Sequence, residues 1–295
     1  MKSVLKLLAI LFLVPAVSCE ADWVVYPDQF VVEGTIESGG NPVVILTKTI
    51  SPSEEDLDVM EEYMKLLSLD PVISVSDGND TVLLDDMTFE GVFPAYTTSR
   101  MVGEPGKTYT LDIRCNGQHL TAVTSIPAPR DIDSLMVYKA GSSSGRYGIT
   151  AGFSDDRSIH SFYQFFVRNG TAGDARFYPA GSGMIDNWNL NTYCTTADTA
   201  GLWHKVYQNI HKELLSDNDS EHREPSVMFE AGDEVTVKLA TLDSVSSEIW
   251  RGLDRGTKTD IGFVAIIENL KSNVNGGMGF WCGMGVSTAK ITVGR

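Results

Sequence analysis

The sequence predicts an all-β protein with minor helices, built as two β-sandwich-like domains. Short segments in which apolar and polar residues alternate recur along the chain, and a period of two is typical of half-buried strands. Turn-forming clusters of Gly, Pro, Asn and Asp separate these segments at 39–42, 77–80 and 104–106. A stiff, proline-rich stretch at 126–130 then divides the chain in two, so we expect the domain boundary there.

The first predicted domain covers residues 29–128. Phe30, Val32 and Ile36 recur at even steps and predict one apolar face of a strand, and residues 109–114 repeat the pattern. One helix is expected to be inserted at 51–69, because a capping-box pair and a proline at the first helical position open a stripe of apolar residues at helical spacing. We interpret the acidic residues of that helix as a solvated face rather than a cation site.

The second predicted domain covers residues 130–295 and is β-rich. Strands are expected near 135–138, 147–149, 162–167, 235–239 and 289–293. Four-residue steps between Leu202, Val206, Ile210 and Leu214 predict a helix near 202–215, and a further helix is expected near 245–253.

The first 18 residues have the order of a secretory signal peptide. Lysines at positions 2 and 6 precede a short apolar run, and small residues then lead directly to Cys19. The apolar run is shorter than the ~20 residues that a membrane-spanning helix needs. A cysteine after small residues resembles the bacterial lipobox, so we predict that Cys19 carries the lipid. The alternative is an ordinary cleaved signal that leaves Cys19 free or in a disulfide.

The net charge of the mature chain excludes some classes of ligand, and the length of its N-terminal segment limits how far it reaches from the membrane. Because residues 1–18 contain two lysines and no acidic residue, their removal takes the net charge from −16 to −18. Such a charge argues against binding of nucleic acid and against adhesion to anionic lipid, both of which attract basic residues. Residues 19–28 then form a lipidated tether. The nine residues from 20 to 28 reach at most roughly 30 Å.

Three cysteines remain after Cys19, at positions 115, 194 and 282, and no CxxC pair occurs. In an oxidising compartment three cysteines allow one disulfide and one free thiol. We expect all three to be buried structural residues, and Cys194–Cys282 is the pair that we predict if a disulfide forms.

Several short segments are similar to catalytic or ligand-binding motifs, but each lacks residues that its motif requires. Residues 103–108 end like a phosphate-binding loop but lack its first glycine, and a strand rather than a helix follows. The acidic segment at 217–221 lacks the glycine and the final glutamate of a calcium loop. Gly276, Gly277 and Gly279 do not match a dinucleotide fingerprint and are interpreted as turn or bulge glycines. The sequence therefore predicts no catalytic residue, no metal site and no cofactor.

Aromatic residues supply the one guess at a ligand site. Trp188, Tyr193 and Trp203 cluster in a loop-rich part of the second domain, where they could stack on a sugar or a peptide. The alternative is that they belong to the core.

Several segments in a fixed order resemble the domain of unknown function 4249 family of Bacteroidota outer-membrane lipoproteins. They are 30–37, 75–78, 106–111, 125–127, 232–235 and 272–281. The resemblance implies an all-β protein on the outer membrane with a first domain of immunoglobulin or prealbumin type. It also implies an association with TonB-dependent transporters, and it carries over no catalytic residue. The acidic residues after Cys19 resemble an export signal, so we expect the protein to face the cell exterior, with the periplasm as the alternative.

Three functions of different classes remain. The leading expectation is a lipid-anchored cell-envelope binding protein, not an enzyme, that is accessory to a TonB-dependent nutrient transporter. The alternative is a structural or adhesive surface lipoprotein, because fold alone does not decide function. A surface glycan or peptide hydrolase is the third, and it requires two suitably spaced carboxyl groups in a cleft. The ligand and the oligomeric state are left open.

Overall fold

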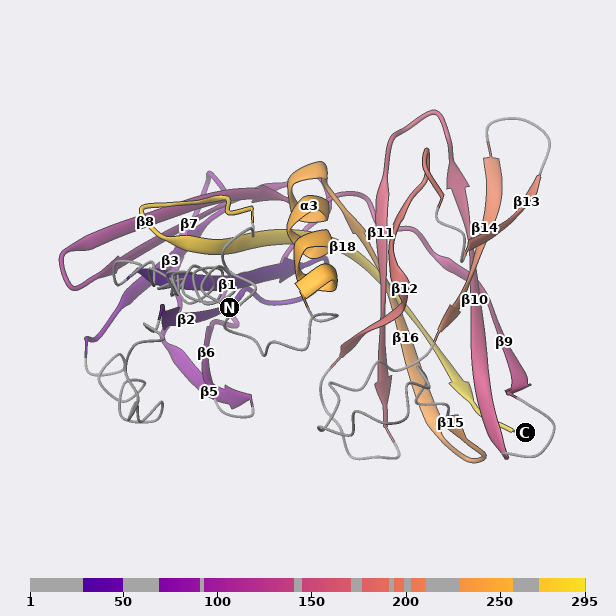
Figure 1. Ribbon diagram of the computed structural model, residues 1–295. Coiled ribbons are helices and arrows are strands. Elements are labelled where there is room, and N and C mark those ends of the chain that lie inside the picture. Colours follow the sequence, from indigo (N-terminus) through magenta and orange to yellow (C-terminus); the bar gives the residue numbers. More distant parts are fainter. Residues whose placement is uncertain are drawn as a thin grey trace, which may run out of the picture.

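The computed structural model describes residues 29–49, 69–90, 93–140, 145–170, 177–190, 194–198, 203–210, 229–256 and 271–294. Three β-sheets make up most of these residues, so the predicted all-β class with minor helices is confirmed. The sheets form two lobes that lie side by side (Figure 1). An eight-stranded sheet, in the order β12-β11-β16-β18-β1-β2-β6-β5, runs through both lobes.

The N-terminal lobe packs a five-stranded sheet, β17-β8-β7-β3-β4, against the part of the long sheet that contains β1, β2, β6 and the first half of β18. Their facing residues form one apolar core that includes Phe30, Tyr109 and Trp281. The strands of this lobe are β1 (Phe30–Glu37), β2 (Val43–Lys48), β3 (Val72–Ser76), β4 (Thr81–Leu83), β5 (Asp86–Glu90), β6 (Phe93–Thr97), β7 (Thr108–Cys115), β8 (Gln118–Ser125) and β17 (Val274–Asn275). The strands predicted at 30–37 and 109–114 are confirmed as β1 and β7.

The C-terminal lobe packs a second five-stranded sheet against the β12-β11-β16 end of the long sheet. In it, β10 is flanked by β9 on one side and by β14 and, beyond the end of β14, the short β15 on the other, and β13 pairs with β14. A separate core with Phe153, Tyr163 and Phe165 fills this lobe. Its strands are β9 (Ile132–Ala140), β10 (Arg146–Asp156), β11 (Phe162–Asn169), β12 (Tyr178–Asp186), β13 (Cys194–Asp198), β14 (Trp203–Ile210), β15 (Phe229–Glu230) and β16 (Glu234–Leu242).

One long strand, β18 (Met278–Thr292), joins the two lobes (Figure 1). Its first half pairs in parallel with β1, from Val31↔Met278 to Glu37↔Met284. Its second half, from Met284 to Thr292, pairs antiparallel with β16. The strand predicted at 289–293 is therefore the end of a much longer element. The residues after 273 contribute to the N-terminal lobe, although the predicted boundary assigned them to the second domain.

The proline-rich break at 126–130 lies against β18 rather than in open solvent. Thr124 Oγ1 accepts a hydrogen bond of 2.7 Å from the backbone N–H of Gly283. A Cβ added to Gly285 would lie 2.1 Å from the carbonyl oxygen of Pro127, so only glycine allows this approach. The connection between the lobes is therefore held by the strand that both lobes share.

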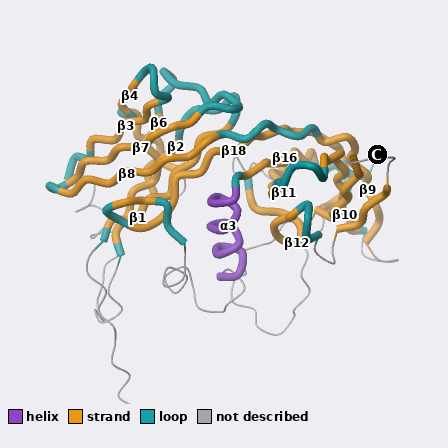
Figure 2. Tube along the Cα trace, turned by 90° about the horizontal axis from the view of Figure 1, so that it is seen from above, coloured by secondary structure: helices purple, strands orange, loops and turns teal. Residues whose placement is uncertain are grey.

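The helix α3 (Ser244–Gly256) lies at the junction of the lobes, against one face of the long sheet (Figure 2). It confirms the helix predicted near 245–253. Ile249 packs with Phe280 and Cys282 of β18, and Trp250 lies edge-on to Phe166 at a ring-centroid distance of 5.4 Å.

The helix predicted near 202–215 is wrong, because residues 203–210 form strand β14. A step of four residues keeps side chains on one face of a helix, but it also keeps them on one face of a strand. Val206 and Ile210 are both fully buried in the second core on that strand face. The helix predicted at 51–69 lies outside the described residues, except for Leu69, which is in a turn.

The cysteine and glycine predictions have different outcomes. Cys115 and Cys282 are buried free thiols, so the guessed Cys194–Cys282 pair is wrong. Gly276 and Gly279 have φ values of +82° and +104°, which confirms them as residues that need the left-handed region. Gly277 packs tightly without a positive φ, since an added Cβ would lie 2.4 Å from Leu120 Cδ2.

Candidate functional site

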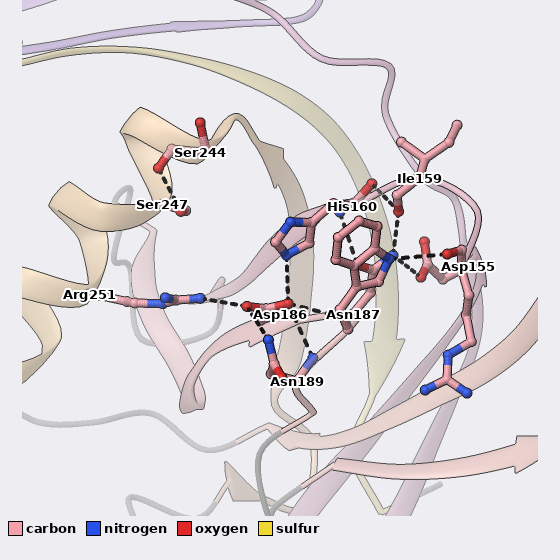
Figure 3. Close-up of polar contacts among 12 residues, drawn as sticks. Asp155, Ile159, His160, Asp186, Asn187, Asn189, Ser244, Ser247 and Arg251 are labelled. Carbon is pink, nitrogen blue, oxygen red and sulfur yellow. Dashed lines mark hydrogen bonds and ion pairs between the residues drawn. The ribbon is translucent and has the colours of Figure 1, made fainter.

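The candidate site is a polar network at one end of the C-terminal lobe (Figure 3). It joins the turn between β10 and β11, at residues 157–161, to the segment 186–190, which begins with the last residue of β12. Arg251 of α3 reaches the same place from the lobe junction. Three elements that are distant in the sequence therefore meet around the carboxylate of Asp186.

Five donors surround the Asp186 carboxylate. Oδ1 accepts hydrogen bonds from His160 Nε2 at 2.9 Å and from the backbone N–H groups of Trp188 and Asn189 at 3.1 and 3.3 Å. Oδ2 accepts from Arg251 Nη2 at 3.1 Å and from Asn189 Nδ2 at 3.4 Å. Burial raises the pKa of Asp186, but these hydrogen bonds outweigh it and the pKa lies below its ordinary value. The network is therefore built on an ionised carboxylate.

A second layer of hydrogen bonds, centred on the fully buried side chains of Asp155, Tyr163 and Asn187, joins the two loops. Asn187 Nδ2 donates to Asp155 Oδ2 and to the carbonyl oxygen of Ile159, both at 2.7 Å, while its Oδ1 accepts from the backbone N–H of Ser161 at 3.0 Å. The phenol of Tyr163 donates to the other oxygen of Asp155. Burial first, and then this carboxylate, raise the pKa of Tyr163 strongly, so the phenol stays protonated and remains the donor. Few polar atoms here can move without breaking a buried hydrogen bond.

Trp188 lies at the surface of this network. Its indole is stacked on the imidazole of His160, with ring centroids 4.1 Å apart and an interplanar angle of 5°. The indole Nε1–H donates to the carbonyl oxygen of Arg157 at 3.1 Å. Trp188 is nevertheless 54% exposed, and its neighbour Ile159 is exposed as well. The site thus presents a large aromatic surface whose orientation is fixed from beneath.

His160 links the exposed and buried layers. Its Nε2 faces Asp186, its ring is covered on one side by Trp188, and Phe162 lies 4.5 Å from it between ring centroids. A carboxylate in this position orients an imidazole and fixes which nitrogen carries the proton. Within the described ranges, no three His, Cys, Asp or Glu residues gather closely enough to hold a metal ion. The contacts of His160 with Asp186, Trp188 and Phe162 hold the exposed aromatic surface in a fixed orientation.

The structure places only part of the predicted aromatic cluster. Trp188 belongs to this network. Tyr193 lies outside the described residues, and Trp203 opens β14 opposite Asp156, with its side chain outside the described part. The predicted lipid-attachment residue Cys19 also lies outside the described residues. Sequence reasoning missed His160, Asp186 and Arg251. A local signal existed only for the turn, since Asp186-Asn187-Trp188-Asn189 is rich in residues that bond their own backbone.

Among the described residues, no helix has the length and apolar character needed to cross a bilayer.

Comparison with known proteins identifies the family of the chain. No curated protein matches it. The family model described as domain of unknown function (DUF4249) matches residues 19–290, which is nearly the whole chain after the predicted signal peptide. The chain therefore belongs to the DUF4249 family.

Proposed function

We propose that the protein is a lipid-anchored cell-envelope binding protein of the outer membrane, facing the cell exterior. It captures a ligand as an accessory to a TonB-dependent nutrient transporter and is not an enzyme. A structural or adhesive surface role is the alternative that the experiments below distinguish.

The proposed anchor is supported by the N-terminal residues and by the charge. Residues 1–18 have the order of a signal peptide, and the family match begins at Cys19, the residue expected to receive the lipid. Two or more acyl chains on one cysteine hold a protein stably at a bilayer. The acidic body offers an anionic membrane no attractive surface of its own, so the lipid is its means of attachment.

The exposed indole of Trp188 is the observation that supports a binding role. A core tryptophan would be covered, whereas this one is held by His160 and by the carbonyl group of Arg157 with more than half of its surface in solvent. Holding an aromatic ring in place before a ligand arrives reduces the entropy lost on binding. Aromatic anchors on a rigid base carry much of the affinity in many binding sites.

The anchor is tested by metabolic labelling with a clickable fatty acid. We expect label on the wild-type protein, recovery of that protein with outer membranes, and neither for Cys19→Ser. Protease treatment of intact cells then reports which side of the membrane the protein faces. Label that persists on Cys19→Ser would overturn the anchor.

The binding role is tested with Trp188→Ala, expressed at the chromosomal locus. The matched control is Val123→Ala, because Val123 is also exposed but lies on the N-terminal lobe. We expect a transporter to co-purify with all three proteins, and growth on complex nutrients to be reduced only by Trp188→Ala. A gene deletion that impairs adhesion and leaves growth unchanged would instead support the adhesive role.

A further inference from the structure

The outward side of the sheet formed by β9, β10 and β14 carries two tyrosines that lie across glycines of the central strand. Tyr138 of β9 is paired with Gly148 of β10. A Cβ added to Gly148 would lie 2.2 Å from Cζ and 2.4 Å from the hydroxyl oxygen of Tyr138. The phenol ring therefore occupies the space that any other side chain at position 148 would fill.

Tyr207 of β14 repeats this arrangement from the opposite side of β10. It is paired with Gly152, where an added Cβ would lie 2.7 Å from both Cδ1 and Cε1 of the Tyr207 ring. Gly148 and Gly152 are four residues apart, which is about 13 Å along a strand. Two aromatic rings from two flanking strands thus lie over one central strand, spaced along it.

These rings face solvent. The alternate residues of β10, Ile149 and Phe153, are fully buried in the second core, so Gly148 and Gly152 are on the outer face of the sheet. Tyr138 is 37% exposed, Met136 between the two tyrosine positions is 49% exposed, and Tyr207 is half-buried. In Figure 1 these strands form the side of the C-terminal lobe that points away from the N-terminal lobe.

Covering a glycine accounts for only one face of each ring. An aromatic ring placed over a strand glycine stabilises a sheet by shielding the backbone. That role needs the inner face of the ring and would be served equally by a ring that is covered from outside. Here the outer face of each ring is exposed to solvent, and its inner face packs against the backbone of a glycine rather than against a flexible side chain.

We infer that this face, which we call the tyrosine face (Tyr138, Tyr207 and Met136 over Gly148 and Gly152), binds a neutral oligosaccharide. The inference rests on the proposed binding function and names its ligand class. The electron-rich face of an aromatic ring attracts the electropositive C–H groups on one side of a sugar ring. Rings about 13 Å apart cannot stack on the same sugar, so the ligand is a chain that follows β10.

Charge selects a neutral ligand over an anionic one. The whole chain has a net charge of −16. On the face itself, Asp133 accepts a hydrogen bond of 2.5 Å from Ser154, and Lys205 of β14 is paired with Ser154, so the two local charges offset each other and the net charge of the chain decides. At low ionic strength, where salt does not screen surface charges, this protein would repel an acidic polysaccharide. Burial raises the pKa of Tyr138, so its hydroxyl stays protonated and available to bond sugar hydroxyls.

The tyrosine face also leads toward the Trp188 site. β10 runs from Gly148 through Gly152 to Asp156, and the next residue, Arg157, provides the carbonyl oxygen that holds the Trp188 indole. A chain that lies along the outer face of β10 would therefore run toward the end of the strand at which the Trp188 indole is held. One oligosaccharide chain that follows β10 could therefore contact both the tyrosine face and the Trp188 site.

The test uses the full chain purified in detergent and an array of neutral oligosaccharides of glucose, xylose, mannose and galactose, with acidic glycans alongside. We expect binding to at least one neutral series, stronger for longer chains. Tyr138→Ala and Tyr207→Ala should each weaken it about 5- to 10-fold, since an aromatic contact contributes about 1 kcal/mol. Tyr138→Trp and Tyr207→Phe keep a ring and should retain binding.

Loss of stability is separated from loss of contact by Tyr147→Leu. Tyr147 packs toward the core from the same strand, so this variant weakens the sheet without touching the outer face. All variants are assayed well below their melting temperatures, and Tyr147→Leu should bind as wild type does. Binding that is unaffected by both tyrosine-to-alanine variants but abolished by Trp188→Ala would overturn the tyrosine face and leave the proposed function standing. Absence of binding to every neutral glycan would overturn it as well, whereas lack of a co-purifying transporter bears on the proposed function alone.

Discussion

Lys238 and Glu37 are 201 positions apart in the sequence, yet Nζ of the lysine lies 2.5 Å from Oε1 of the glutamate. They come from β16 and β1, the two strands that flank β18, so the pair crosses the strand shared by both lobes. The lysine side chain is only 8% exposed, and its ammonium also lies over the rings of Phe177 and Phe166, at 4.2 and 5.1 Å from their centroids. The glutamate is 30% exposed.

Removing the carboxylate of Glu37 should lower the free energy of unfolding more than removing the buried ammonium group of Lys238. Glu37→Gln leaves an ammonium group buried without its carboxylate, and we expect the free energy of unfolding to fall by about 2 kcal/mol, less than for a fully buried pair. Lys238→Met keeps the apolar contact with the two rings, and it should stay within about 1 kcal/mol of wild type. Urea denaturation of both variants measures the difference. If both variants lose the same free energy of unfolding, the attraction within the pair, and not the cost of an unpaired buried ammonium group, would account for the loss.

Asp186 should make stability depend on pH in a defined direction. Its pKa is lower in the folded protein than in the unfolded chain, so its contribution to the free energy of unfolding is complete above the unfolded pKa, near 3.9, and is lost as the pH falls through the lower, folded pKa. Asp186→Asn should destabilise the protein by about 1–3 kcal/mol at pH 7, because it leaves charged and polar donors poorly satisfied.

This difference between wild type and Asp186→Asn should shrink as the pH falls below about 4, because the Asp186 carboxylate becomes protonated first in the unfolded wild-type chain and then, at lower pH, in the folded protein. Thermal unfolding of the two proteins across that range measures it, and the remaining acidic residues cancel in the comparison. A difference that stays constant from pH 7 to pH 3 would contradict the hydrogen-bonded, ionised carboxylate described here.

Gly279 should tolerate no side chain. Its φ of +104° is unfavourable for other residues, and a Cβ would lie 1.9 Å from the carbonyl oxygen of Val32, its partner strand residue. We expect Gly279→Ala to lower the free energy of unfolding by at least about 3 kcal/mol. Gly78→Ala is the matched control, because Gly78 also has a positive φ, +91°, but nothing lies within 4 Å of an added Cβ. The control should lose only about 1 kcal/mol.

Cys282 should be unreactive while the protein is folded. Burial raises its pKa to about 12, so almost no thiolate is present at neutral pH. Cys115 is also buried, with a raised pKa. Iodoacetamide at pH 8, followed by peptide mass spectrometry, should label neither residue in the folded protein and both in urea. Labelling of Cys282 in the folded protein would mean that the junction beneath α3 opens.

The sequence predicts local strands well because alternation and turn residues are local signals. β1, β7 and β16 lie where their patterns indicate, and α3 has a clear helical period. The prediction for 202–215 fails because a four-residue step satisfies both a helix and a strand. Pairing of β1 with β18 is a choice of partner across some 250 residues, and no local pattern encodes it.

The candidate site shows the same limit. Trp188 could be singled out as an aromatic residue in a polar turn, but the sequence does not indicate which residues hold it. His160 and Arg251 reach Asp186 from a different turn and from the helix α3, and only the packing of β11, β12 and α3 brings them together. Tyr138 and Tyr207 gain their significance from Gly148 and Gly152, which are adjacent to them only in the folded sheet.

The position of β18 has a consequence for the order in which the chain can fold. During synthesis β1 emerges early, but its parallel neighbour is completed only when residue 292 has been made. Until then β1 and β16 each have an unpaired edge, and exposed edges favour pairing with other chains. Contacts of such high sequence separation also form slowly. The N-terminal lobe therefore cannot mature ahead of the C-terminal lobe, and a chain that stops before β18 would expose two open sheet edges.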